Sequence, residues 1–159
     1  SERSETDESH SLRGPVDRSA LLTIRDIIEK TEPLAAPSLD DYLNPTVLEV
    51  PLEDGICDAE SARIDVQWTT RGDYKFHYTD TDEVDFRWGS HPHDGDYIHV
   101  PGLAHYHPPP AATSDPAAVE ESCIKQSVET LVTRAVLKLC RVAYHADSYA
   151  PLNAASNPP

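Results

Sequence analysis

The sequence predicts an α+β fold in which an antiparallel β-meander of about four strands combines with an N-terminal helix and a long C-terminal helix. Three observations support this class. Residues 62–88 alternate apolar and polar side chains with a period of two, broken by short polar turns. Apolar residues in 17–31 and 117–144 recur instead at three- and four-residue steps, the period of a helix that faces a core. With 159 residues, the chain is long enough to bury one core.

The N-terminal third is predicted to hold one helix between two segments without regular structure. Residues 1–16 are mostly Ser, Glu, Asp and Arg, which is typical of a disordered acidic head. A helix follows over 17–31, with Asp17 or Ser19 as its cap. Three prolines between 32 and 46 interrupt any further helix and indicate a linker.

The middle of the chain is predicted to form consecutive antiparallel strands. A short strand is expected at 47–52. A tight polar turn joins strands at 62–70 and 73–80 into a hairpin. A third strand begins at Val84, and a fourth is expected near 96–100.

The C-terminal part is predicted to be one long amphipathic helix over 115–144. Asp115 followed by Pro116 is a typical helix start. The predicted organisation is a head at 1–16, a helix and Pro-rich linker at 17–46, an α+β domain at 47–144 and a flexible tail at 145–159.

Composition excludes several classes of protein. The sequence contains no run of about 18 apolar residues that could span a membrane. A net charge of −15 excludes a generally basic nucleic-acid-coating protein. Three cysteines do not make a disulfide scaffold, and they predict free thiols in a reducing cytoplasm.

The acidic charge is concentrated near the N-terminus and predicts a halophilic protein. Residues 1–61 carry 15 acids and 5 bases, and the chain has four Lys against nine Arg. In about 1 M salt the Debye length is about 3 Å, so repulsion between carboxylates is largely screened. The alternative is a mesophilic acidic protein with a disordered head.

Histidines cluster in the predicted sheet region. Five of the eight lie within 91–107, as the pairs His91 and His93, His105 and His107, and the single His99. In an extended segment, side chains two apart point the same way, so each pair can present two imidazoles to one side. Three interpretations stay open. They are exposed polar residues, an acid–base site that needs no cofactor, or a divalent-metal site made of His91, His93, His105 and His107.

Cations are expected on the same face of the sheet as some of these histidines. On alternating strands, Lys75, His77 and Arg87 point away from the apolar side chains of Tyr74 and Tyr78. Such a face suits an anionic ligand such as a phosphate. The alternative is a solvated face with salt bridges to neighbouring aspartates.

These residues also carry a family resemblance. Residues 62–144 resemble a group of haloarchaeal proteins and, beyond it, the TumE family of toxins from toxin–antitoxin pairs. The matching motifs are GDYKFHY at 72–78, RW at 87–88, HPH at 91–93 and HYHPPP at 105–110. Gly89 and Ser90 stand where an acid and a base usually follow the RW pair.

The resemblance implies a small α+β toxin that acts on RNA and is neutralised by an antitoxin-like protein partner. A metal-independent ribonuclease needs a base, an acid and a cation at the phosphate. The implied catalytic residues are His77, Arg87, His91, His93, His105 and His107. The implied RNA contacts are Arg71, Tyr74, Lys75 and Tyr78, with the tyrosines stacking on bases.

Two functions from other classes remain as alternatives. One is a non-catalytic protein–protein interaction module that forms a homo-oligomer through the 115–144 helix. The other is a histidine-rich metal-binding module. Neither involves a membrane.

Overall fold

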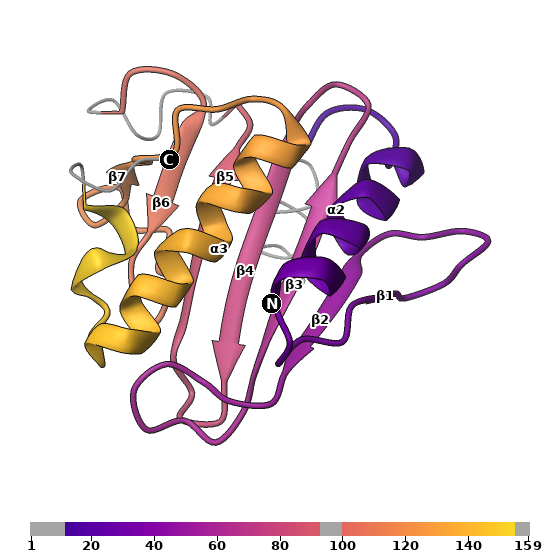
Figure 1. Cartoon of the computed structure of the whole chain (residues 1–159). Helices are drawn as coiled ribbons and strands as arrows, with labels where there is room; N and C mark the ends of the chain where they lie inside the picture. Colours follow the sequence, from indigo (N-terminus) through magenta and orange to yellow (C-terminus); the bar gives the residue numbers. More distant parts are fainter. Residues whose placement is uncertain (1–11, 93–99, 155–159) are drawn as a thin grey trace.

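The computed structural model describes residues 12–92 and 100–154, and it shows two helices packed on one face of an antiparallel sheet (Figure 1). Within these residues, seven strands follow one another across the sheet in sequence order. The elements are α2 (Arg18–Thr31), β1 (Ser38–Leu39), β2 (Leu48–Leu52), β3 (Ala62–Trp68), β4 (Tyr74–Asp80), β5 (Asp85–Ser90), β6 (Ala104–His107), β7 (Glu120–Glu121), α3 (Glu129–Ala146) and the 3-10 helix η1 (Ala150–Asn153). The predicted α+β meander is confirmed, with more strands than the predicted four.

The predicted N-terminal helix is confirmed as α2. The Asp17 side chain caps it by accepting a hydrogen bond from the Ala20 amide at 3.0 Å. Leu21, Ile24 and Ile28 are buried on the stripe that faces the sheet. The stripe places α2 beside α3 and over the sheet, as Figure 1 shows.

The predicted hairpin is confirmed as β3 and β4, and its alternation builds the core. Trp68 pairs with Tyr74 across the hairpin, and their rings stack with centroids 4.8 Å apart. Tyr78 stacks on Phe86 of β5 in the same way, at 4.5 Å. These aromatic side chains all point toward the helices and are buried, so the residues between them point to the other face of the sheet.

The strand expected near 96–100 falls mostly in a segment that the structure does not describe. Residues 93–99 lie outside the described residues, and the strand that pairs with β5 is β6, at 104–107. The short strand expected at 47–52 is confirmed as β2, and the two-residue strands β1 and β7 are additions at the two edges of the sheet.

The prediction of a helix over 115–144 is wrong in its first half. Asp115 starts only a turn, in which its carbonyl accepts from the amides of Ala118 and Val119. The chain then forms β7, which pairs with β6. Val119 and Ile124 are buried, but in an extended segment, so the apolar pattern that predicted a helix here reflects burial without one. The oligomerisation surface expected along 115–144 therefore lacks its first 14 residues, because α3 begins at Glu129.

The two ends of the described chain also differ from the expected flexible head and tail. Arg13 to Val16 run along the β3–β4 turn, where the Thr70 amide donates to the Pro15 carbonyl at 2.9 Å. At the other end, Leu152 of η1 is fully buried. The Asn153 side chain accepts from the Cys123 amide at 2.7 Å, which ties η1 to the segment after β7.

No helix among the described residues combines the length and hydropathy needed to cross a membrane.

Candidate functional site

The polar side chains of the three central strands lie on the sheet face opposite the helices. The register places His77 beside Arg87, and Arg87 beside His107, in one row across β4, β5 and β6. A second row contains Lys75, Gly89 and His105. Residues directly opposite each other on one face have Cβ atoms about 5 Å apart. We call this group, together with His91 at the end of β5, the His/Arg face; its members are Lys75, His77, Arg87, His91, His105 and His107.

Gly89 lies beside two of three clustered imidazoles, those of His91 and His105. A Cβ atom at Gly89 would lie 3.5 Å from both His105 Nε2 and His91 Cδ2. The ring centroids of His91 and His105 are 4.5 Å apart, and those of His105 and His107 are 5.1 Å apart. Both Cβ distances are ordinary van der Waals contacts, so a methyl group fits at Gly89 against the two rings.

The hydrogen bonds of the three imidazoles assign the same tautomer to each. The Nδ1 atoms of His91, His105 and His107 lie 3.1, 2.8 and 2.9 Å from backbone carbonyl oxygens. A carbonyl oxygen can only accept, so each Nδ1 carries the proton. In the neutral ring the lone pair is then on Nε2, the arrangement used by histidines that bind metals or remove protons.

Burial holds His91 in this neutral form. Its pKa falls to about 4 because burial disfavours the charged ring, and nearby Lys75 and Arg87 lower it further. His91 is 7% exposed. At neutral pH it is therefore a base or a hydrogen-bonding group, and it adds no charge to the face.

His77 has a different environment and a different partner. Its side chain is 30% exposed, and its Nε2 lies 3.1 Å from the Asp85 Oδ1. A carboxylate at this position orients the ring. Sequence reasoning treated the neighbouring aspartates only as salt-bridge partners, whereas Asp85 positions one of the candidate catalytic groups.

The two cations of the face are buried beside the histidines. Lys75 is 7% exposed and Arg87 is 9% exposed. The Arg87 Nη2 donates to the Ser114 hydroxyl at 3.3 Å, and the His107 Nδ1 donates to the Thr113 carbonyl. The segment that follows the three prolines thus lies over this end of the face.

An acidic group at the edge of the face has a partner that the sequence did not indicate. Asp73, 2% exposed, accepts from the Arg13 backbone amide at 2.7 Å and from two guanidinium nitrogens at 2.9 Å. Although burial raises the pKa of Asp73, the hydrogen bonds from Arg13 lower it below its ordinary value. Arg13 lies in the segment predicted to be disordered, so nothing local indicated this pairing.

Several predicted site residues lie elsewhere. Tyr74 and Tyr78 are in the core on the helix face, 2% and 1% exposed. Arg71 is exposed in the β3–β4 turn, and His93 lies outside the described residues. The structure therefore brings together Lys75, His77, Arg87, His91, His105 and His107, and separates the tyrosines from them.

The metal interpretation depends on His93. Within residues 12–92 and 100–154, no group of three or more His, Cys, Asp or Glu side chains is arranged to hold a metal ion. The predicted four-histidine metal set includes His93, so this set stays a prediction.

Comparison with known proteins identifies the family. The sequence model of toxin TumE matches residues 24–139, a span that includes every residue of the His/Arg face. No curated protein and no solved structure matches the chain. The match covers well over half of the sequence, and the chain belongs to the TumE toxin family.

Proposed function

We propose that this chain is the cytoplasmic toxin of a toxin–antitoxin pair, and that its His/Arg face binds and cleaves RNA without a metal. The observation that supports the proposal is the alignment of two cations and four imidazoles on one sheet face. Its protein partner is an antitoxin, in keeping with the family. The core tyrosines Tyr74 and Tyr78 have no part in this mechanism.

The chemistry of RNA cleavage needs groups of the kind found on this face. A base removes the proton from the 2′-hydroxyl, an acid protonates the 5′-oxygen that leaves, and a cation stabilises the charge on the phosphate. His105 and His107 have their lone pairs on Nε2, as a base requires. His77, which Asp85 orients, is the candidate acid. Arg87 lies between His77 and His107 in the same row, where it can contact the phosphate.

Substrate access requires a local rearrangement. His107 is 1% exposed, and Thr113 and Ser114 bond to His107 and Arg87. A phosphate reaches Arg87 and His107 only when this segment moves. We expect this segment to move away when RNA binds. The RNA phosphates then replace the Ser114 hydroxyl at Arg87 and the Thr113 carbonyl at His107.

The acidic charge of the chain sets the conditions for binding. A net charge of −15 repels RNA at low salt, whereas molar salt screens both attraction and repulsion. The proposed halophilic setting therefore favours recognition by short hydrogen bonds over long-range attraction.

The proposal is tested with purified protein and with growth of an inducible host that has no TumE relative. His107→Asn and Arg87→Gln should reduce RNA cleavage by about 10²- to 10⁴-fold and relieve growth arrest. Arg63→Gln is the matched control, because Arg63 is an exposed cation on the same sheet face, paired with Asp65 at 3.0 Å. Melting temperatures identify variants that fail to fold. His77→Gln, at a more exposed position, should also lose cleavage.

Two further measurements make the test sharper. An RNA with a single 2′-deoxy nucleotide at the cleavage position should resist cleavage, and a chelator should leave the rate unchanged. Full cleavage or full growth arrest by folded His107→Asn and His77→Gln proteins would show that the His/Arg face is not the active site.

A further inference from the structure

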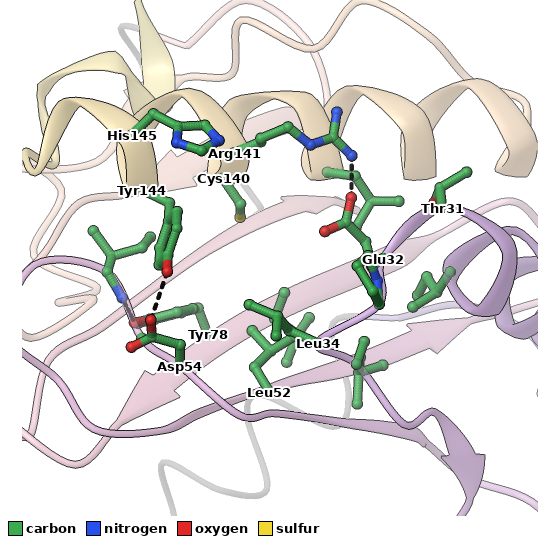
Figure 2. A pocket seen from close by; sticks show the side chains of 18 residues that line it. Thr31, Glu32, Leu34, Leu52, Asp54, Tyr78, Cys140, Arg141, Tyr144 and His145 are labelled. Carbon is green, nitrogen blue, oxygen red and sulfur yellow. Dashed lines mark hydrogen bonds and ion pairs between the residues drawn. The ribbon is translucent and has the colours of Figure 1, made fainter.

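A separate cavity lies on the helix side of the sheet, away from the His/Arg face. It has a volume of about 270 Å³ and lies between the C-terminal halves of α2 and α3, strands β2 and β3, and the loop after β2. Its interior is mainly aliphatic, with side chains that include Ile28, Val50, Leu52, Ile64 and Leu137. In Figure 2, Leu34 and Leu52 lie between Asp54 on one side of the cavity and Glu32 on the other.

Two polar pairs stand at opposite sides of the cavity, and each joins α3 to another part of the chain (Figure 2). On one side, Arg141 forms an ion pair with Glu32 at the end of α2. On the other side, the Tyr144 hydroxyl donates to the Asp54 carboxylate at 2.5 Å.

The two carboxylates differ in charge compensation. Glu32 has a guanidinium beside it, whereas the partner of Asp54 is a neutral phenol. The pKa of the Tyr144 hydroxyl is raised by its hydrogen bond to Asp54, so it stays neutral. Burial raises the pKa of the Cys140 thiol, which also lines the cavity, to about 12. Among the described residues, Asp54 forms no ion pair with a cation.

We propose that this cavity binds a small primary amine with an apolar, aromatic or branched body. The body fills the aliphatic interior, and the ammonium group pairs with Asp54 while Tyr144 keeps its hydrogen bond. A cavity of about 150 Å³ holds a benzene molecule, so the volume here accepts a ring with a short side chain. A carboxylate at one side of the cavity selects an amine over a neutral or acidic molecule of the same shape. This site is independent of the proposed RNA chemistry.

The experiment measures binding of three molecules of similar shape by calorimetry and by amide chemical shifts of the full chain. The probes are 2-phenylethylamine, 2-phenylethanol and 3-phenylpropionate. We expect the amine to bind about tenfold more tightly than the alcohol, and the acid to bind most weakly. Asp54→Asn should reduce amine binding to the level of the alcohol. Asp58→Asn, an exposed acid in the same loop, is the matched control and should leave the preference unchanged.

A cavity-filling variant tests the location. Ala35 lines the cavity and pairs with Leu52 in an isolated β-bridge, so Ala35→Phe adds a ring inside the space while it keeps the backbone contact. It should abolish binding of both the amine and the alcohol, and Leu52→Phe serves the same purpose if Ala35→Phe does not fold. No binding of the amine at millimolar concentration, equal binding of the three probes, or unchanged binding by the folded cavity-filling variant would each overturn the proposal.

Discussion

Mild acid is expected to destabilise the fold through the buried ring of His91. The neutral ring is held with a pKa of about 4, against 6.5 for its ordinary value. The unfolded chain therefore binds a proton at His91 once the pH falls below about 6.5, whereas the folded protein does so only near pH 4. The contribution of the neutral His91 ring to stability is complete above about pH 6.5. It is lost as the pH falls from about 6.5 to about 4.

The size of the effect follows from the pKa difference. Each pH unit inside this window costs about 1.36 kcal/mol of unfolding free energy, so about 1.5 units below the unfolded value the loss is about 2 kcal/mol. Lys75 and Arg87 strengthen the effect because they disfavour a charged ring, and Asp73 weakens it. The measurement is urea unfolding of the wild type and of His91→Gln at several values between about pH 7.5 and pH 5.

The comparison of the two proteins isolates the ring. Other titrating groups contribute equally to both, so the difference in unfolding free energy between wild type and His91→Gln should shrink by about 2 kcal/mol across this range. A constant difference would refute the reasoning, because it would mean that the His91 pKa is the same in the folded and unfolded chains.

Three further substitutions test the packing. Thr133 is fully buried and its hydroxyl has no hydrogen-bond partner in the described part of the chain; Thr133→Val should raise the unfolding free energy by about 1 kcal/mol in urea. Leu152→Ala should lower it by about 2–5 kcal/mol, because Leu152 of η1 is fully buried; a neutral effect would mean that the tail does not pack. Arg13→Ala removes the two guanidinium donors to Asp73 and keeps the backbone donor, so it should lower the melting temperature and move acid unfolding to higher pH; an unchanged acid limb would contradict the pairing.

Local patterns were sufficient for the central elements. The helix at 17–31 and the hairpin at 62–80 were predictable because each satisfies one period and has its own cap or turn. The same alternation placed Lys75, His77 and Arg87 on one face, since neighbours in a strand point to opposite sides.

The segment before α3 shows where local patterns fail. Val119 and Ile124 belong to the apolar pattern that predicted a helix, yet they are buried because β7 pairs with β6 and because Asn153 bonds to Cys123. These contacts join residues more than ten positions apart, and no short window of sequence contains both partners. Non-local pairing therefore overrode a helical pattern that was otherwise complete.

The sequence by itself determined the meander, the inward aromatic side chains and the presence of histidines and cations on one side of the sheet, because these depend on the order of residues within single strands. Only the tertiary structure decided which histidines meet across Gly89, which nitrogen of each ring carries the proton, and that Arg13 holds Asp73. These depend on the register between strands and on contacts between distant segments, which are fixed by packing of the whole chain.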